Sequence, residues 1–303
     1  MPKANELPDT LRVYHSHGVR LDWDGAHKEA IADCPWCGRE RKFSVTVATG
    51  LWRCFVCNEG EANGKPIQGG NPLTFVRKLY ELSFDATQPS AYKELAQERR
   101  LLYPDTLIEW GAAKSMLTGS WILPGYSATG KLNNIYLYLP VEGKRRLLPT
   151  ATLGHQLFGV PLYKPGAEQV YLCEGPWDAM ALHEVLGNSD SEGKLCARPS
   201  SRLNSASILA APGCNIFFES WLPLFANKEV YILFDNDYPK ANRATGTETL
   251  GGGILGAERV ANTLAAAEAP PRSIAYACFG ERGYTERLPD GCDLRDCLTL
   301  SYL

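Results

Sequence analysis

Residues 169–182 read QVYLCEGPWDAMAL, and residues 229–237 read EVYILFDND. In each stretch a short apolar run, typical of a buried strand, leads directly into carboxylates. Further strand-like runs lie at 207–210 and 274–277, and helix-like periodicity occupies 177–186 and 256–267. This alternation of strands and helices predicts a parallel α/β sheet with its active residues at the carboxyl ends of the strands.

The carboxylates that follow these strands form an ordered set. Glu174 and Asp178 follow the first strand, Asp235 and Asp237 follow the second, and Asp293 begins a later DLRD sequence. Carboxylates gathered at one sheet edge repel each other unless a hard cation lies among them. We therefore predict that all five hold Mg²⁺ or Mn²⁺, which in proteins commonly bridges to phosphate oxygens. Any one of them alone is more typical of a helix cap or a solvated loop.

Four of the ten cysteines form two C-x₂-C pairs with metal-ligand spacing. The pairs are Cys34 with Cys37 and Cys54 with Cys57, and 16 residues separate them. Alternating residues at 43–47, followed by a turn, predict a hairpin with one pair at each end, which is the arrangement of a zinc ribbon. Four thiolates close the coordination sphere, so we predict one structural Zn²⁺ per chain. Four coincidental core cysteines are the alternative.

Basic and aromatic side chains are interleaved around this predicted ribbon. Arg39, Lys42 and Trp52 are our candidates for binding single-stranded nucleic acid, because cations contact phosphates and aromatic rings stack on bases. The alternative is that the aromatic residues fill a small core and the charged residues are solvated.

A second basic group lies in the middle of the chain. Lys144, Arg145 and Arg146 follow a predicted hairpin turn at Glu142-Gly143. We predict that these three residues hold the backbone of a nucleic-acid template or a triphosphate, and a solvated turn is the alternative.

The composition is that of a folded protein with an uneven charge distribution. The 303 residues are 45% hydrophobic and 21% charged, which excludes disordered and fibrous chains. Neither a membrane span nor an apolar signal region is visible, so we expect a cytoplasmic protein with no membrane partner. The net charge is −3, but residues 1–166 carry 20 Lys and Arg against 16 Asp and Glu, and the rest carry 11 against 18. A basic first half and an acidic second half suit polymer binding joined to cation binding; two unrelated solvated surfaces are the alternative.

Composition also divides the chain into three predicted domains. A polar, glycine-rich stretch ends a ribbon domain at 1–70, and a basic domain with strand-like runs follows at 71–166. The parallel-sheet domain occupies 167–303 and contains a serine-rich surface insertion at 187–207. We thus expect a multidomain α/β and α+β protein, in which a small β zinc ribbon precedes a mixed α/β core.

The motifs Glu-Gly-x-x-Asp at 174–178, Asp-x-Asp at 235–237 and Asp-x-x-Asp at 293–296 resemble those of the Toprim domain. With a zinc ribbon ahead of them, they resemble the DNA primases of bacteria and their phages, and the likeness covers most of the chain. The resemblance implies a primase core in which the Toprim acids Glu174, Asp235 and Asp237 are catalytic. It also implies synthesis of short RNA primers on a single-stranded DNA template from metal-bound NTPs, with Lys240 and Arg243 as candidates for holding the triphosphate.

Because this sequence carries no helicase motor of its own, we expect a separate replicative helicase as partner. The compact layout leads us to expect a phage- or mobile-element-encoded protein that acts in the host cytoplasm. The sequence departs from the family pattern at the glycine-rich stretch 246–256, which is longer than the usual link after Asp-x-Asp, and at Cys292, where many relatives carry lysine. The alternative function is a non-catalytic DNA-binding protein resembling the recombination mediators, which also combine a zinc finger with Toprim.

Overall fold

The computed structural model describes residues 7–57, 69–188, 205–235, 237, 240–241, 248–249, 251–276 and 293–300. The chain divides into two compact units. Unit 1 comprises residues 1–87, 111–124 and 132–155, and unit 2 comprises residues 88–110, 125–131 and 156–303. The domain boundaries near residues 70 and 166 stay predictions. Among the described helices, none is long and apolar enough to cross a bilayer.

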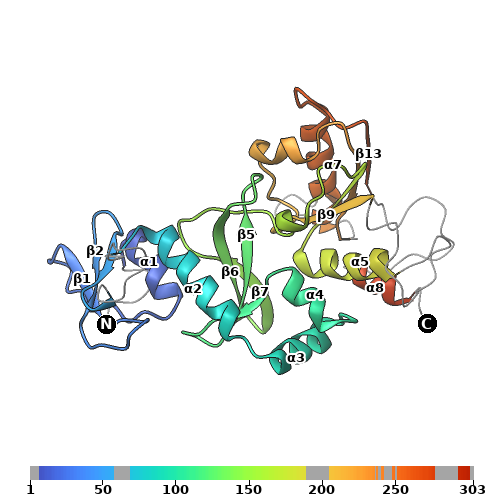
Figure 1. Cartoon of the computed structure of the whole chain (residues 1–303). Coiled ribbons are helices and arrows are strands. Elements are labelled where there is room, and N and C mark those ends of the chain that lie inside the picture. Colours follow the sequence, from blue (N-terminus) through green and yellow to red (C-terminus); the bar gives the residue numbers. More distant parts are fainter. Residues whose placement is uncertain are drawn as a thin grey trace. The chain divides into compact units, whose positions relative to one another are not determined.

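Unit 1 begins with helix α1 (Asp9–Ser16) and a three-stranded antiparallel sheet. Its strands, drawn in blue in Figure 1, are β1 (Glu29–Ala32), β2 (Phe43–Thr46) and β3 (Trp52–Cys54), in the order β1-β2-β3. The predicted hairpin is confirmed, because β2 and β3 pair antiparallel with Phe43 opposite Cys54. The first strand was not predicted from the sequence.

Helix α2 (Pro72–Ala86) completes the core of this small sheet. The helix begins where the sequence places a cap and a proline: the side chain of Asn71 accepts a hydrogen bond from the Thr74 amide at 2.9 Å, and Pro72 fills the first helical position. Its buried Phe75 makes ring contacts with Phe43 and with Trp52. The ribbon therefore shares a hydrophobic core with the helix that follows it.

A second antiparallel sheet of four strands follows, in the order β4-β5-β6-β7. Its strands are β4 (Ala113–Lys114), β5 (Trp121–Tyr126), β6 (Leu132–Val141) and β7 (Lys144–Pro149). The predicted turn is confirmed: Val141 pairs with Lys144, and the two residues between them have φ values of 48° and 78°. Positive φ at both positions is the type I′ geometry that joins strands in tight hairpins.

Unit 2 contains the predicted parallel sheet, with its strands in the order β13-β10-β8-β9. All three strand pairs are parallel. The strands are β8 (Gln169–Cys173), β9 (Ala206–Ala210), β10 (Glu229–Leu233) and β13 (Ser273–Tyr276). The described helices of this unit are α3 (Pro89–Arg99), α4 (Pro104–Glu109), α5 (Pro176–Asn188), α7 (Gly252–Ala265) and α8 (Leu294–Leu300). Two 3₁₀ turns are η3 (Val160–Leu162) and η4 (Glu219–Leu224). The short strands β11 (Lys240–Ala241) and β12 (Glu248–Thr249) pair with each other. The predicted fold class is confirmed.

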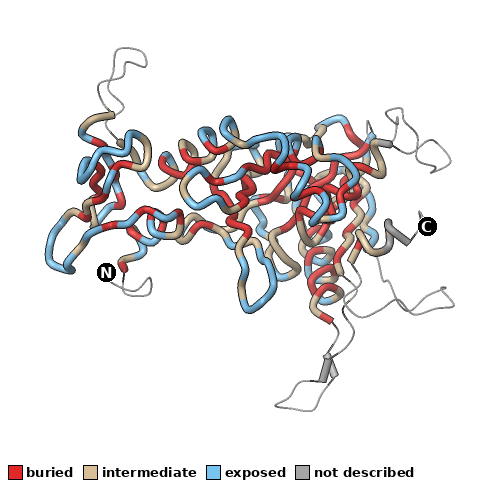
Figure 2. Tube along the Cα trace, turned by 90° about the horizontal axis from the view of Figure 1, so that it is seen from below, coloured by how far each residue is buried: buried red, intermediate tan, exposed pale blue. Residues whose placement is uncertain are grey.

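The core of unit 2 follows from the apolar runs in its strands. Val170 and Leu172 of β8 and Val230 and Ile232 of β10 are at most 1% exposed and belong to one cluster of buried residues. Buried positions are red in Figure 2.

One buried acid of unit 2 also has a structural role. The carboxylate of Glu184 in α5 accepts hydrogen bonds from the amides of Leu102 and Tyr103 and from the hydroxyl of Thr106. These bonds fix the connection between α3 and α4.

Candidate functional site

The four predicted zinc ligands lie together in unit 1. The Sγ atoms of Cys34, Cys37, Cys54 and Cys57 all lie within 4.8 Å of one another. The Cys34–Cys57 and Cys37–Cys54 sulfur distances are 3.6 and 3.8 Å. A tetrahedral ion with Zn–S bonds of about 2.3 Å places its sulfurs roughly 3.8 Å apart, so the quartet fits Zn²⁺.

Local backbone geometry supports the same conclusion. The amides of Val56 and Cys57 donate to the Sγ atom of Cys54 at 3.4 and 3.3 Å. Burial raises the pKa of the Cys54 thiol, but these amides favour the thiolate, and the net result is a pKa lowered to about 7. The tight turn at Cys54 thus prepares its sulfur for a cation. The role of that ion would be structural, because all four ligands come from the protein.

The candidate nucleic-acid contacts on the ribbon divide into exposed and buried residues. Arg39 and Lys42 are exposed, as predicted for phosphate contacts. Trp52 is only 4% exposed, with its ring stacked on Phe43, so the described conformation leaves it no free face for a base. The exposed aromatic residue is Phe55, which is 51% exposed and has the Arg53 guanidinium 4.6 Å from its ring centroid.

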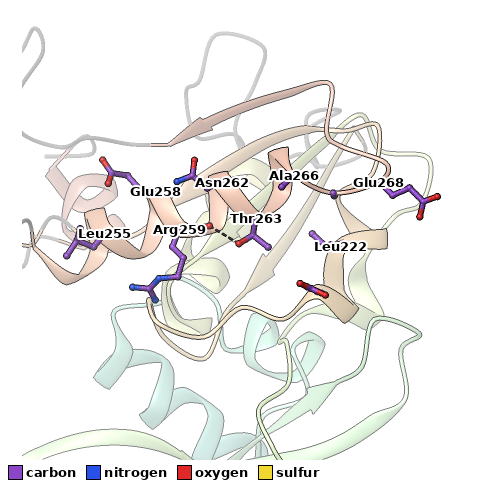
Figure 3. A pocket seen from close by; sticks show the side chains of 10 residues that line it. Leu222, Leu255, Glu258, Arg259, Asn262, Thr263, Ala266 and Glu268 are labelled. Atoms are coloured by element: carbon purple, nitrogen blue, oxygen red, sulfur yellow. Dashed lines mark hydrogen bonds between the residues drawn. The ribbon is translucent and has the colours of Figure 1, made fainter.

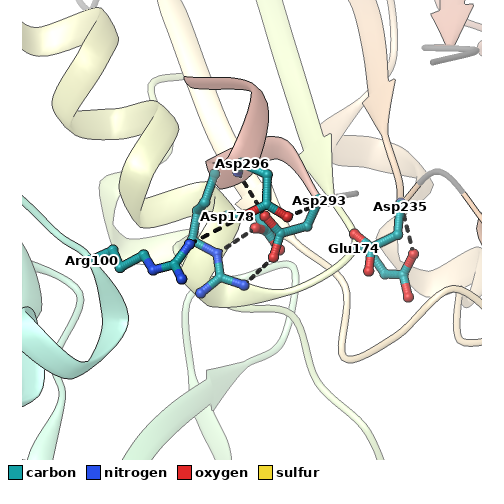
Figure 4. A network of polar contacts seen from close by, with 7 residues as sticks. Arg100, Glu174, Asp178, Asp235, Asp293 and Asp296 are labelled. Carbon is teal, nitrogen blue, oxygen red and sulfur yellow. Dashed lines mark hydrogen bonds and ion pairs between the residues drawn. The ribbon is translucent and has the colours of Figure 1, made fainter. Parts of the chain in front are cut away.

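In unit 2, the parallel register brings two predicted acids to one edge of the sheet. Cys173 at the end of β8 pairs with Leu233 at the end of β10, so both chains emerge side by side. The amide of Asp235 donates to Oε2 of Glu174 at 3.0 Å (Figure 4). Burial raises the pKa of both carboxyls, and the neighbouring acids, led by Glu174, help to raise the pKa of Asp235 to about 8. Two acids held this close favour a cation between them.

Asp237 is held by the first turn of α7. Its Oδ2 atom accepts a hydrogen bond from the Gly253 amide at 3.0 Å. A Cβ atom at Gly251 would lie 1.8 Å from the Asp237 carbonyl oxygen, and one at Gly253 would lie 2.1 Å from that of Asp235. Only glycine permits this close approach, which explains Gly251 and Gly253 of the glycine-rich stretch. Residues 246–247 and 250 of that stretch lie outside the described part of the chain.

Asp178 and Asp293 are held differently, by an arginine that the sequence analysis did not select. The Nε atom of Arg295 lies 2.8 Å from Oδ1 of Asp178, and its Nη2 atom pairs with Oδ2 of Asp293. At the start of α8 the Asp296 amide donates to Oδ1 of Asp293 at 2.9 Å, and the Asp293 amide donates to Oδ2 of Asp296 at 3.3 Å, in the manner of a capping box. The DLRD sequence is the signal for this arrangement, because it places an arginine between two acids at a helix N-terminus.

The five predicted cation ligands therefore form two groups. Glu174, Asp235 and Asp237 have no arginine among the partners that the structure gives them, whereas Asp178 and Asp293 share Arg295. Among the described residues, the cysteine quartet is the one set of three or more such ligands within 4.8 Å of one another. Glu174, Asp235 and Asp237 do not form such a set. Mg²⁺ in proteins is typically held by one or two carboxylates together with waters and phosphate oxygens.

The basic residues of the hairpin lie exposed on β7. Side chains alternate along a strand, so Lys144 and Arg146 lie on one face and Arg145 on the other, where its guanidinium is 5.5 Å from the Tyr138 ring centroid. At most two of the three can thus contact one ligand through the same face. Of the remaining candidates, Lys240 lies in β11 and Arg243 lies outside the described residues.

An open groove of about 780 Å³ lies between η4 and α7 (Figure 3). Its lining includes Glu219, Glu258 and Glu268 against one arginine, Arg259, whose guanidinium donates to Asn215. An acidic lining does not suit a polyanion, and the described lining residues include none of the predicted site.

No protein-family model matches the chain, and no curated protein matches it. Solved structures similar to it are those of primases, the group that the sequence motifs resemble. The zinc-binding and RNA polymerase domains of the Aquifex aeolicus primase are 15% identical with a TM-score of 0.41, over 99% of this chain and 83% of that one. The primase fragment of the bacteriophage T7 primase-helicase is 14% identical with a TM-score of 0.42, over 93% and 96%. The RNA polymerase domain of Mycobacterium tuberculosis primase is 14% identical with a TM-score of 0.45, over 75% and 78%. At these low identities and scores the similarities establish no activity.

Proposed function

We propose that this protein is a DNA primase, which synthesises short RNA primers on single-stranded DNA with the Toprim-type sheet of unit 2 as its catalytic centre. The observation that supports this most directly is the pairing of Glu174 with Asp235 at adjacent parallel strand ends. Burial and, after it, the negative charge of Glu174 raise the pKa of Asp235, and a hard cation between the two carboxylates relieves their repulsion. Carboxylate oxygens are the ligands that Mg²⁺ and Mn²⁺ prefer, so Glu174, Asp235 and Asp237 fit such an ion.

In the proposed reaction, the 3′-hydroxyl oxygen of one nucleotide attacks the α-phosphorus of an NTP, and the bond to the β-phosphate oxygen breaks to release pyrophosphate. The carboxylate of Glu174 takes the hydroxyl proton. Because Gly253 holds Asp237 and the Asp235 amide holds Glu174, these acids are oriented before the substrates arrive. A divalent cation bound there would neutralise the charge of the triphosphate.

We further propose that the zinc ribbon of unit 1 binds the template through Arg39, Lys42 and Phe55. Exposed cations for phosphates and an exposed aromatic ring for a base are the two elements of a single-strand surface. Single-stranded DNA and NTPs are thus the proposed ligands. A separate replicative helicase is the proposed protein partner.

The test is primer synthesis on a mixed single-stranded template library with four ribonucleotides and Mg²⁺ or Mn²⁺. Asp235→Asn and Asp237→Asn remove one charge each at nearly constant volume, and each should lower the rate on the order of 10²-fold or more. The matched control is Asp85→Asn, on the exposed face of α2, which should retain the rate of the unsubstituted chain.

A template-binding titration accompanies the rate measurement. Template binding should persist in the Asp235 and Asp237 variants, because the ribbon lies in unit 1. Normal primer synthesis by the doubly substituted Asp235/Asp237 chain would exclude a catalytic role for these acids. Template binding with no synthesis by the unsubstituted chain would favour the non-catalytic DNA-binding protein instead.

A further inference from the structure

Arg295 is enclosed between two of the acids that the Toprim resemblance assigns to metal binding. Its side chain is 18% exposed, and those of Asp178 and Asp293 are 10% and 17% exposed. One guanidinium nitrogen pairs with each carboxylate. The two acids, Asp178 and Asp293, are labelled in Figure 4. Both acids therefore have a positive partner that belongs to the protein itself.

The position of Arg295 is set by α8, on which it is the second residue. The side chain of Asp293 caps this helix by accepting the Asp296 amide at 2.9 Å, and Asp296 in turn pairs with Arg100 at 3.4 Å. The guanidinium therefore belongs to a capped helix, α8, and the acid Asp178 belongs to the neighbouring helix α5. A bridge between two carboxylates at the edge of a sheet is also the place that a second divalent ion takes in two-metal sites.

The chemistry of a guanidinium differs from that of such an ion. It carries one permanent positive charge, and its planar donors are directed at the carboxylates that it pairs with. It offers no open coordination position to a phosphate oxygen or a water molecule. While it is in place, Asp178 and Asp293 have their charge compensated and their facing oxygens occupied.

We propose that Arg295 is a built-in counter-cation that occupies Asp178 and Asp293 and confines divalent metal to Glu174, Asp235 and Asp237, so that the native site takes a single ion per chain. The inference rests on the cation site of the proposed function. In this arrangement Arg295 is a positioning residue, because it acts through the two carboxylates.

The test counts Mn²⁺ ions bound to the zinc-loaded full chain by electron paramagnetic resonance, with no substrate present. The unsubstituted chain should bind one Mn²⁺, and the Asp235→Asn/Asp237→Asn chain should bind none. Arg295→Gln frees two carboxylates and should bind a second ion, whereas Arg295→Lys keeps a positive charge and should still bind one. Two bound ions in the unsubstituted chain, or one in a folded Arg295→Gln chain, would overturn the proposal.

A second measurement does not depend on the folding of the Arg295 variants. If Arg295 keeps Asp178 from the metal, Asp178→Asn should change Mn²⁺ affinity by no more than about threefold. The control is Asp296→Asn, which removes the charge that pairs with Arg100, and it should change the affinity to the same extent. If Asp178 were a direct ligand, its substitution would instead lower Mn²⁺ affinity about tenfold or more. That larger loss in Asp178→Asn alone would show that Asp178 binds the ion and that the assignment to Arg295 is wrong.

The outcomes separate this inference from the proposed function. A chain that binds no Mn²⁺ contradicts the cation site itself, and the counter-cation role falls with it. A chain that binds one Mn²⁺ at Asp235 and Asp237, but makes no primers, contradicts the primase activity and leaves the role of Arg295 standing.

Discussion

The Nε atom of Arg295 lies 2.8 Å from Oδ1 of Asp178, although 117 positions separate the two residues in the sequence. This contact joins the first turn of α8 to the first turn of α5. Asp178 is 7% exposed, and Arg295 provides the positive charge that compensates for its burial.

We predict that Arg295→Gln lowers the free energy of unfolding by about 3 kcal/mol, because the buried Asp178 loses its ion-pair partner and keeps only the weaker electrostatic influence of Arg99. Urea denaturation at pH 7 measures this change. Arg100→Gln is the matched control: its ion pair with Asp296 joins side chains that are 70% and 42% exposed, so its loss should cost at most about 0.5 kcal/mol. Equal losses in the two variants would contradict the assignment of Arg295 as the essential partner.

Zinc should be required for the fold of the ribbon and not for that of the parallel sheet. We predict that Cys54→Ser loses stoichiometric zinc and template binding, because three thiolates do not close the coordination sphere. Elemental analysis and a template-binding titration measure these losses. Cys214→Ser, at a cysteine of unit 2, is the control and should retain one zinc. One zinc per chain in Cys54→Ser would show that the ion lies elsewhere.

The basic hairpin should contribute to nucleic-acid binding through charge. Replacing Arg145 and Arg146 by alanine should flatten the salt dependence of single-stranded DNA binding by roughly 0.7 log units for each phosphate that the protein no longer neutralises. Substituting Lys93 and Arg272, which are exposed residues of unit 2, removes the same charge as a control. If both pairs change the slope equally, the hairpin is an ordinary solvated surface.

Unit 1 should lose stability as the pH falls below about 6.5, because of one buried histidine. His17 is fully buried, its Nε2 atom lies 2.9 Å from the Thr150 hydroxyl, and burial lowers its pKa to about 4. Between these two pKa values the unfolded chain binds the proton more tightly, so acid favours unfolding.

The expected loss from His17 is about 2 kcal/mol between pH 7 and pH 5. Urea denaturation at the two pH values should show this difference in the unsubstituted chain and in His15→Gln, which changes an exposed histidine. His17→Gln should lack this contribution. An identical pH dependence in His17→Gln would mean that another group is responsible.

Local patterns in the sequence determined the parts of this protein whose partners are near in the chain or repeat regularly. The two C-x₂-C pairs predicted the sulfur cluster because each pair places its ligands through one tight turn. The apolar runs at 169–173 and 229–233 predicted parallel strands whose following acids lie at one edge of the sheet. The sheet order, which makes β8 and β10 neighbours, places Glu174 beside Asp235. The Glu142-Gly143 turn was predictable because a glycine, which adopts positive φ readily, lies between two strand-like runs.

Only the tertiary structure decided which side chains meet across long separations in the sequence. The burial of Trp52 depends on Phe75, which comes from a helix assigned by sequence to another domain. The division of the acids depends on Arg295, and no local periodicity indicates that it reaches Asp178. Periodicity reports which face of an element is apolar, whereas the choice of partner depends on how the elements pack. That packing decides here which carboxylates are left to bind a cation.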